Sequence, residues 1–345
     1  MKLALFTHMP WPTGIDQKSV FDNTISQVKL AESIGYHSAW FAEHHFTRYS
    51  ISASLMIILG YISAITETIR LGTGVIVPSL HNPIRVAEDA AHVDLLSNGR
   101  LDIGFGRGSF GYEFEGFNVP NNDHDTFQSS VLDIRNLLST NNQYFTSSYS
   151  TKLELPLVPN PVQKPHPPFY IAASNSVETL DFLVRNEFKI CIAVVQDTNK
   201  ALELIDRYYA ACMNMNRSPY MEDVPFFRYI HVAETEKKAE ENTKKHVNWI
   251  QDIMQWRRNN SNRSELGFLN DEWRESVKEY SIDFSYIKNN RAFIGTPEQV
   301  AEKVNFLKDH NISYLGCNFA LGGLNQSKII ESMKLFDKKV VPLIS

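Results

Sequence analysis

The stretch that decides the fold is residues 70–108, RLGTGVIVPSLHNPIRVAEDAAHVDLLSNGRLDIGFGRG. Its two ends, 70–78 and 100–108, are short apolar runs, and the segment between them begins with Pro83 and ends at Gly99. Proline is favoured in the first turn of a helix and glycine just after its end, so we predict a helix here. The flanking runs are apolar throughout, which is typical of strands covered on both faces. The stretch therefore predicts two parallel strands joined by a helix.

The same alternation continues along the rest of the 345 residues. The further apolar runs are LALFT (3–7), SAWFAEH (38–44), PFYIAAS (168–174), KICIAVV (189–195), PFFRYIHVAE (225–234) and ISYLGCNFA (312–320). Segments with helical periodicity separate them, and one begins with a capping box at Thr296 and Gln299. Eight strand–helix units in about 250–400 residues fit a closed barrel better than a doubly wound open sheet. We therefore predict an α/β fold, a (β/α)8 TIM barrel that forms a single domain over residues 1–345.

Two segments interrupt this alternation, one after the fourth helix and one after the seventh strand. The first, 141–167, is predicted to be a small hairpin followed by a proline-rich return. The second, 257–293, combines a loose polar stretch with a segment that could form a short helix. Long insertions beside the active-site end of a barrel are good candidates for lids, so we expect that role for 257–293.

The composition indicates a globular protein and excludes several classes of partner. With 43% hydrophobic residues, 21% charged residues and a net charge of −5, the chain has no basic excess for binding nucleic acid. No apolar stretch approaches the ~18–20 residues that a membrane span requires. The three cysteines, Cys191, Cys212 and Cys317, form no zinc or disulfide pattern. We therefore expect a cytoplasmic protein without a nucleic-acid partner, a membrane partner or a bound metal.

The second apolar run ends in EHHFT (43–47), where a strand of such a barrel would present functional residues. A carboxylate beside two imidazoles in an apolar mouth is costly unless it is paired or used. His44 is therefore a candidate general acid or base. A metal site is a second interpretation, but His44 and His45 are adjacent on an extended segment and point to opposite sides. A purely structural histidine pair is the third interpretation.

The fourth strand continues into GFGRGSFG (104–111), which holds Arg107. This segment matches the dinucleotide motif G-x-G-x-x-G, but that motif must open a helix, and 112–125 lacks an amphipathic pattern. Accessible amides and the guanidinium of Arg107 can still bind phosphate, although a flexible loop with a surface arginine explains the same residues. The helix that begins near Ser176 offers a second anion site at its N-terminus, or only an ordinary cap.

The third strand carries Gly74, where the missing side chain allows a flat ligand to approach or only relieves packing. Taken together, the candidates place an arginine and a helix N-terminus on adjacent strands of one rim that is rich in aromatic residues. Such a rim fits a flat ligand that carries a phosphate group.

Several motifs of the chain, considered together, resemble those of the bacterial luciferase-like flavin-dependent monooxygenases. They are EHHFT (43–47), GTGVIVP (72–78), HNPIRVAED (81–89), LSNGRLDIGFGRG (96–108), GTPEQ (295–299) and the C-terminal SMKLFDKKVVPLIS. The resemblance runs from Met1 to the last of these segments and is greatest to the luciferase alpha chain, an alkanal monooxygenase.

The resemblance implies a (β/α)8 barrel and a reaction between reduced FMN (FMNH2), a diffusible substrate, and O2. The flavin C4a-hydroperoxide formed in this way would attack a small, largely apolar organic substrate, for which an aldehyde or a ketone is an option. A separate NAD(P)H:flavin reductase would supply FMNH2.

The resemblance also implies roles for individual residues. His44 would be the catalytic histidine, Glu43 would lie under the flavin, and Gly74–Val75 would be a non-prolyl cis peptide against which the ring packs. The flavin phosphate would be bound by Arg107, Ser176 and Thr179, while Gly106, Ser109 and Phe110 would line the ring and Asn175 would also belong to the flavin site.

Two of these positions depart from the luciferase alpha chain. That chain has a cysteine where this one has Gly106, and a glutamate where this one has Asn175. The first difference leaves light emission and a preference for long-chain aldehydes open, and the second could alter the affinity for flavin.

Two other functions remain as alternatives, an F420-dependent oxidoreductase of the same superfamily and a non-enzymatic flavin-binding protein. Uptake of O2 separates both from a monooxygenase. We also expect a homodimer, formed through the apolar helix at 53–65 and the helix at 83–97, whose small residues permit close approach.

Overall fold

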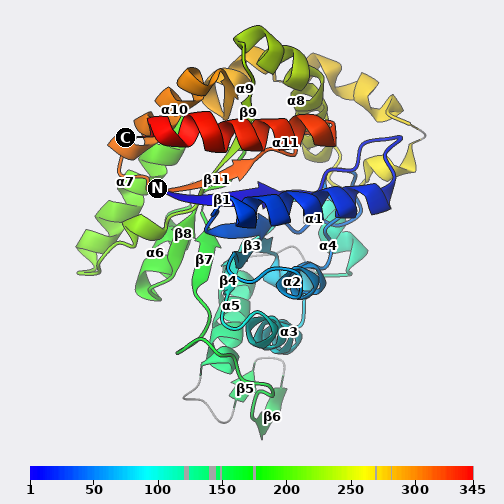
Figure 1. Cartoon of the computed structure of the whole chain (residues 1–345). Helices are drawn as coiled ribbons and strands as arrows, with labels where there is room; N and C mark the ends of the chain where they lie inside the picture. Colours follow the sequence, from blue (N-terminus) through cyan, green and yellow to red (C-terminus); the bar gives the residue numbers. More distant parts are fainter. Residues whose placement is uncertain are drawn as a thin grey trace.

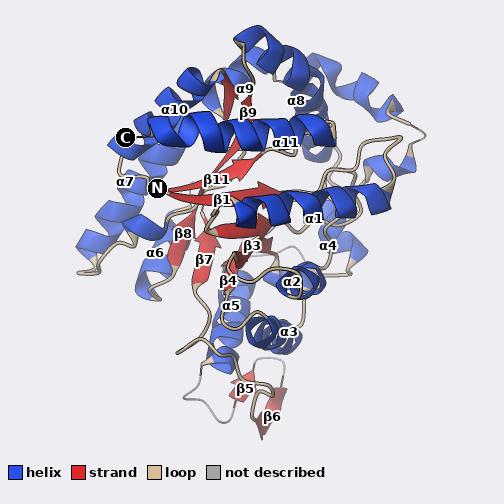
Figure 2. Ribbon diagram, in the orientation of Figure 1, coloured by secondary structure: helices blue, strands red, loops and turns tan. Residues whose placement is uncertain are grey.

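The computed structural model describes residues 1–119, 124–139, 145–147, 150–173, 176–268, 270–280 and 282–344. Its centre is a sheet of nine strands with helices packed on the outside (Figure 2). The strands are β1 (Lys2–Thr7), β2 (Ser38–Phe41), β3 (Arg70–Ile76), β4 (Leu101–Phe105), β7 (Phe169–Ala172), β8 (Lys189–Cys191), β9 (Phe226–Val232), β10 (Ala292–Gly295) and β11 (Tyr314–Asn318). All pairs are parallel, and the order is β10-β9-β11-β1-β2-β3-β4-β7-β8.

The sheet curls until its two ends approach each other. Just beyond β8, Ile192 forms a parallel bridge with Phe226 of β9, so the strand at one end of the order lies beside one near the other end. The predicted α/β fold with parallel strands is therefore confirmed. The prediction counted eight strands and missed β10, which pairs with β9 from Ala292 to Gly295. Four residues inside a segment expected to be an insertion are too few to give a periodic signal.

The helices that cover the sheet begin and end largely where the local sequence dictates. They are α1 (Gln17–Ser33), α2 (Leu55–Ser63), α3 (Pro83–Leu96), α4 (Gly111–Gly116), α5 (His124–Leu138), α6 (Val177–Arg185), α7 (Thr198–Asn214), α8 (Glu236–Asn259), α9 (Phe284–Asn290), α10 (Pro297–Asp309) and α11 (Gln326–Leu335). The side chain of Asn82 caps α3 before Pro83, and Gly99 follows the helix with a φ of 78°. At α10 the capping box of Thr296 and Gln299 is formed in both directions.

Large aromatic rings fill the inside of the curled sheet because glycines on neighbouring strands make room for them. A Cβ on Gly72 would lie 2.2 Å from the ring of Trp40, and one on Gly316 would lie 2.0 Å from the ring of Phe227. Trp40 is completely buried. Each substitution of these glycines would displace a ring from a close-packed interior, so the glycines are fixed by packing.

The two segments expected to be insertions have structure of their own. In the first, β5 (Phe145–Ser147) and β6 (Ser150–Leu155) pair antiparallel and lie apart from the main sheet, at the lower end of Figure 1. The second contains a 3-10 helix at Glu272–Tyr280 and α9 before it enters β10. It also includes the last turn of α8, which contains Arg257.

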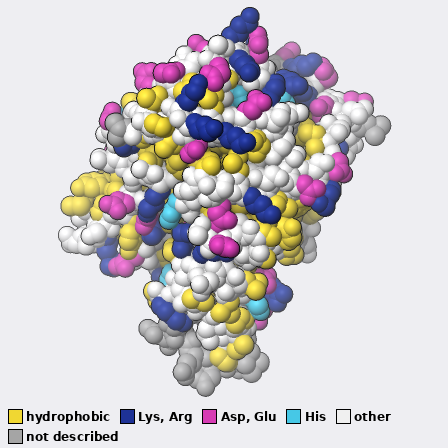
Figure 3. Space-filling model, in the orientation of Figure 1, with side chains coloured by type: hydrophobic (Ala, Val, Ile, Leu, Met, Phe, Trp, Pro, Cys, Tyr) yellow, Lys and Arg dark blue, Asp and Glu magenta, His cyan; other side chains and the backbone are white. Residues whose placement is uncertain are grey.

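The surface carries both signs of charge. On the face shown in Figure 3, lysine and arginine side chains are interspersed with aspartate and glutamate, in keeping with the net charge of −5. Within the described ranges, we find no helix with the length and hydropathy needed to cross a membrane.

Candidate functional site

A cavity of about 340 Å3 opens at the carboxyl ends of the strands. The loops that follow β1, β2, β3, β4 and β8 contribute to its wall, and so does α8. Ligands of parallel α/β folds bind at this end of the sheet. Eight residues predicted from the sequence line the cavity, and they are Glu43, His44, Gly74, Val75, Gly106, Arg107, Ser109 and Phe110.

A large part of the cavity wall is apolar. Phe6 and Phe227 lie with their ring centroids 4.4 Å apart, and Val194, Val195 and Met254 extend the apolar surface. A few polar groups at the ends of the strands also line the cavity. An apolar wall with a small number of placed polar groups is typical of a site for a small organic molecule.

The wall between β3 and β4 is flat because glycine is required there. The peptide between Gly74 and Val75 is cis, as the resemblance implied. A Cβ on Gly106 would lie 2.4 Å from Cγ2 of Val75, and one on Gly104 would lie 2.2 Å from the carbonyl oxygen of Thr73. The side chain of Val75 thus occupies the space that a cysteine at 106 would need. A flat wall of this kind fits the face of a planar ring.

At the rim of the cavity, Arg107 lies close to the N-terminus of α6. Its Nη1 is 2.8 Å from Nε2 of His124. Ser176 caps α6, accepting a hydrogen bond from the Thr179 amide at 3.2 Å and donating one to Glu178 Oε2 at 2.7 Å. This hydroxyl lowers the pKa of Glu178, and the charges of His124 and Arg107 lower it further, so all these groups share one neighbourhood.

Two side chains that can carry positive charge therefore face a capped helix N-terminus, an arrangement that can bind phosphate. Ser176 and Thr179 stand at this helix end and do not line the main cavity. Asn175, which was also predicted to bind flavin, lies outside the described residues. His124 was missed because nothing in its local sequence marks it.

The side chain of His44 has two partners on the same ring nitrogen. Its Nδ1 lies 3.2 Å from Glu113 Oε1 and 3.1 Å from Arg257 Nη2, and these two partners are 3.0 Å apart. The guanidinium of Arg257 also donates from Nε to the Tyr112 hydroxyl at 2.7 Å. Its carbon is 3.4 Å from the ring centroid of Phe110. Arg257 thus belongs to the site, although it comes from α8.

This surrounding controls the charge of His44. Burial lowers the pKa of the imidazole, the charge of Arg257 lowers it further, and Glu113 opposes both. Burial acts to raise the pKa of Glu113, but the hydrogen bond and charge of His44, followed by the charge of Arg257, lower it below its usual value. The lowered pKa of His44 favours the neutral imidazole near neutral pH, beside the ion pair of Arg257 and Glu113.

Glu43 is the centre of a second hydrogen-bonded group. Its Oε1 lies 2.8 Å from His45 Nε2 and 2.7 Å from His81 Nε2, and its Oε2 accepts a hydrogen bond from the Val77 amide at 3.2 Å. Burial acts to raise the pKa of Glu43, but the hydrogen bonds from His45 and His81 lower it. The three side chains could ligate a metal, since their donor atoms lie within 4.8 Å of one another. Hydrogen bonding already accounts for their placement, and it turns His45 away from His44.

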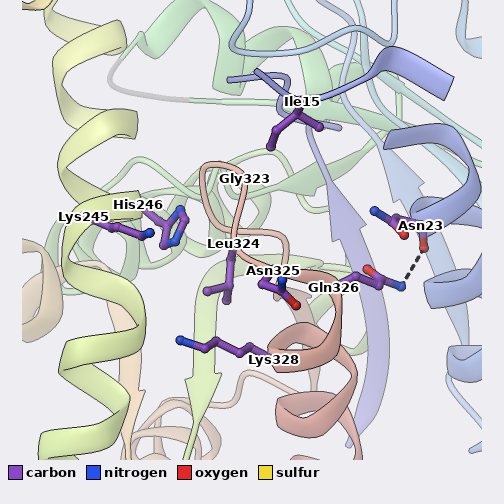
Figure 4. A pocket seen from close by; sticks show the side chains of 9 residues that line it. All are labelled: Ile15, Asn23, Lys245, His246, Gly323, Leu324, Asn325, Gln326 and Lys328. Carbon is purple, nitrogen blue, oxygen red and sulfur yellow. Dashed lines mark hydrogen bonds between the residues drawn. The ribbon is translucent and has the colours of Figure 1, made fainter. Parts of the chain in front are cut away.

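A second cavity, of about 420 Å3, lies between α8 and the start of α11 (Figure 4). Lys245, His246 and Lys328 line it, and Gln326 hydrogen-bonds the carbonyl of Asn23 at its edge. It contains none of the residues predicted from the sequence. The carboxyl-end cavity, which holds eight of them, is therefore the candidate site.

The structure has two features around the site that the sequence did not indicate. The segment 112–125 was expected to form no amphipathic helix; it contains most of the six-residue α4 (Gly111–Gly116), which turns Glu113 toward His44, and the first residues of α5. Arg257 was assigned to a loose polar stretch, but it lies in the last turn of α8 with its side chain 0% exposed. Both were missed because their polar sequence gave no sign of burial, which arises only from contacts between distant segments.

Comparison with known proteins places this chain in a family. The profile described as luciferase-like monooxygenase matches residues 1–311. The alkanal monooxygenase alpha chain of the Kryptophanaron alfredi symbiont is 25% identical and aligns over 100% of this chain and 98% of its own. The oxygenase component of flavin-dependent trigonelline monooxygenase of Acinetobacter baylyi is 27% identical over 70% of this chain and 67% of its own.

Solved structures share the fold along the whole chain. The oxygenating constituent of 3,6-diketocamphane monooxygenase of Pseudomonas putida, in complex with FMN, has a TM-score of 0.80 and 17% identity, covering 100% of this chain and 99% of that one. An F420-dependent secondary alcohol dehydrogenase, in complex with an F420–acetone adduct, has a TM-score of 0.74 and 15% identity with the same coverage. At these identities the likeness concerns the fold alone.

Proposed function

The chain belongs to the luciferase-like monooxygenase family, and we propose that it is the oxygenase component of a two-component system that uses FMNH2 and O2. The observation that carries this proposal is the meeting of three features in one cavity. They are the flat glycine wall beside the cis peptide Gly74–Val75, the buried imidazole of His44, and Arg107 at the rim. A planar ring, a proton and a phosphate group would each have a matching partner there.

The residues present fit FMN. The ring would lie against Gly74, Val75 and Gly106, with Glu43 beneath it, and Ser109 and Phe110 would border it. The phosphate would be held by Arg107 and by the α6 N-terminus with Ser176 and Thr179, and Asn175 would belong to the flavin site. Reduced flavin bound there supplies the two electrons with which one atom of O2 enters the substrate and the other leaves as water. His44 would hold or transfer a proton beside the reacting atoms, and the apolar wall would exclude bulk water.

The wall also favours a class of substrate. Apart from the polar groups near His44, it is formed by side chains such as Phe6, Phe227 and Met254. A small, largely apolar molecule with one carbonyl group, an aldehyde or a ketone, matches this surface.

The assembly belongs to the same proposal. A separate NAD(P)H:flavin reductase would supply FMNH2, in agreement with the trigonelline monooxygenase relative, whose matched chain is the oxygenase component of a flavin-dependent enzyme. The chain would form a single (β/α)8 barrel domain in the cytoplasm, where its three cysteines stay reduced. A homodimer through α2 and α3 would cover Ile57, Tyr61 and Leu96, which are 74%, 55% and 67% exposed.

An experiment with the purified chain tests the proposal. FMNH2 is titrated anaerobically, O2 is then admitted, and a panel of aldehydes and ketones is screened for oxygenated products. The proposal requires tight binding of FMNH2 and at least one product that depends on O2. An F420-dependent reaction is the second candidate because the fold is shared with such an enzyme. It would be indicated by reduction of a ketone with reduced F420 in the absence of O2.

A further inference from the structure

We infer that Arg257 and Glu113 act together as positioning residues that decide which nitrogen of His44 carries a proton. In the protein without flavin or substrate, His44 would carry a proton on Nε2 in both of its charge states and would titrate at Nδ1, so that the Nε2 proton is the one held beside the reacting atoms. This inference deepens the proposed function and rests on it, since it assigns the proton-holding atom of the same site. Neither positioning residue was found from the sequence, and neither needs to touch the substrate or the flavin.

A hydrogen-bond donor and a hydrogen-bond acceptor lie beside the same atom of His44, its Nδ1. Nδ1 of His44 lies 3.1 Å from a nitrogen of Arg257, which can only donate, and 3.2 Å from an oxygen of Glu113, which accepts when ionised. The Arg257 and Glu113 atoms are themselves 3.0 Å apart. Nδ1 can therefore find a hydrogen-bond partner in either protonation state without movement of any side chain.

The two states follow from simple hydrogen-bond logic. When Nδ1 is unprotonated, its lone pair accepts a hydrogen bond from Arg257, and the proton of the neutral imidazole is on Nε2. When Nδ1 is protonated, it donates to Glu113, and Nε2 is again protonated. The remaining neutral form, with the proton on Nδ1 alone, would lose the hydrogen bond from Arg257 and set two N–H groups against each other, as the imidazolium does, but without the positive charge that Glu113 stabilises in the imidazolium. The pair thus selects the Nε2 tautomer.

Nε2 is the nitrogen left to face the cavity. His44 lines the cavity wall, and among the described residues nothing hydrogen-bonds its Nε2. The imidazole would therefore present its Nε2 proton to an oxygen atom in the cavity, while Nδ1, on the shielded side, is the nitrogen that titrates in the flavin-free protein. This orientation suits binding of a carbonyl or another oxygen-bearing group.

Arg257 is held rigidly enough for this role. Its side chain is 0% exposed, its Nε donates to Tyr112, and its guanidinium stacks on Phe110 at 3.4 Å. Both contacts require a planar group with donors in fixed directions, which lysine lacks. Since Arg257 stands in the last turn of α8, movement of this helix end would release both the donor and the charge from His44.

Other titratable groups surround His44 and take part in its charge balance. His8 follows β1 with its ring centroid 6.1 Å away, and burial, followed by the charges of His44 and Arg257, lowers its pKa. The ring of Tyr49 is 5.1 Å away. Burial raises the pKa of the Tyr49 hydroxyl, so it stays neutral. Glu43 acts weakly to raise the pKa of His44. Among these described neighbours, Arg257 and Glu113 alone contact Nδ1.

The test uses NMR of the full chain labelled with [15N]histidine, without flavin. The eleven histidines are resolved by subtraction of the His44→Gln spectrum. In the wild-type chain we expect His44 to be neutral at neutral pH with its proton on Nε2. In Arg257→Met its proton affinity should rise about tenfold, one pKa unit, and the Nδ1 tautomer should appear. Glu113→Gln should shift the titration in the opposite direction.

A neighbouring residue provides the control. Arg258 is the next residue of α8 and is exposed, so Arg258→Met should leave the His44 titration unchanged. If folded Arg257→Met titrates at the wild-type pH with the wild-type tautomer, the inference is wrong. If that variant fails to fold, Glu113→Gln decides, because an unchanged titration there overturns it equally. Absence of monooxygenase activity would refute the proposed function and leave this measurement unaffected.

Discussion

Substitution of Gly106 by alanine should damage the flavin site more than it damages the fold. The φ of Gly106 lies outside the left-handed region, so its backbone suits any residue and only space opposes a side chain. The new Cβ would lie 2.4 Å from Cγ2 of Val75. Since carbon atoms pack at about 3.5 Å, the valine methyl must move by about 1 Å, and the open space lies toward the cavity.

The magnitude follows from this displacement. Overpacking of this kind costs about 1–3 kcal/mol of stability. A shift of about 1 Å in a group that positions a reactant can cost about 10²-fold in turnover. We therefore expect kcat/KM for the oxygenation to fall about 10²-fold, while the free energy of unfolding falls by only about 1–3 kcal/mol and the chain stays folded.

Urea unfolding, FMNH2 titration and initial rates measure these effects. The double variant Gly106→Ala with Val75→Ala should recover much of the lost affinity, because the clashing methyl is gone. Gly267→Ala is the control, since a Cβ there meets nothing within 4 Å. If the single variant bound and turned over FMNH2 like the wild type, or if the double variant were no better than the single one, the flat wall would not be the flavin cradle.

Four further predictions concern the phosphate site, the catalytic histidine, the Glu43–His81 pair and the proposed homodimer. Arg107→Ala should weaken FMNH2 binding by about 1.5–3 kcal/mol and leave riboflavin binding unchanged, and an equal loss for both flavins would place Arg107 away from the phosphate. His44→Gln should keep FMNH2 affinity but lose roughly 10²–10⁴-fold in turnover, and single-turnover product formation at the wild-type rate would remove its catalytic role. The Glu43 hydrogen bond and charge raise the pKa of His81 despite its burial, so the pair stabilises the fold below the unfolded pKa of histidine and loses this as pH rises through the folded value. His81→Gln should therefore lose more stability at about pH 5.5 than at about pH 9 in urea unfolding, and a pH-independent loss would contradict the pairing. Ile57→Glu on α2 should convert the proposed homodimer to a monomer in light scattering, and a wild-type monomer at micromolar concentration would remove the proposed interface.

The sequence alone was sufficient for the elements whose signals are local. The segment 70–108 contains its own strand runs, cap and terminating glycine, and the structure has β3, α3 and β4 there. His44 and Arg107 could be found because each stands at the end of such a strand. In both cases a short segment carries all the information that the prediction needs.

The parts that were missed depend on contacts between distant segments. Glu113 and Arg257 are 144 residues apart in the chain and meet where the last turn of α8 contacts α4. Their burial as an ion pair has no periodic pattern that could announce it. The same is true of His81, which stands in a recognised motif but gains its role only from Glu43, 38 residues earlier. Strand β10 was missed because pairing with β9, and not its own four residues, defines it.

Under the proposed function, this chain uses reduced FMN to transfer one oxygen atom from O2 to a small, largely apolar substrate. The most direct test supplies the purified protein with FMNH2 and 18O2 and analyses the aldehyde and ketone panel by mass spectrometry. We expect a product that contains one 18O atom, formed in an amount that matches the flavin oxidised and lost in His44→Gln. If FMNH2 binds but all of the O2 consumed is recovered as hydrogen peroxide with every substrate, or if FMNH2 does not bind, the claim is contradicted.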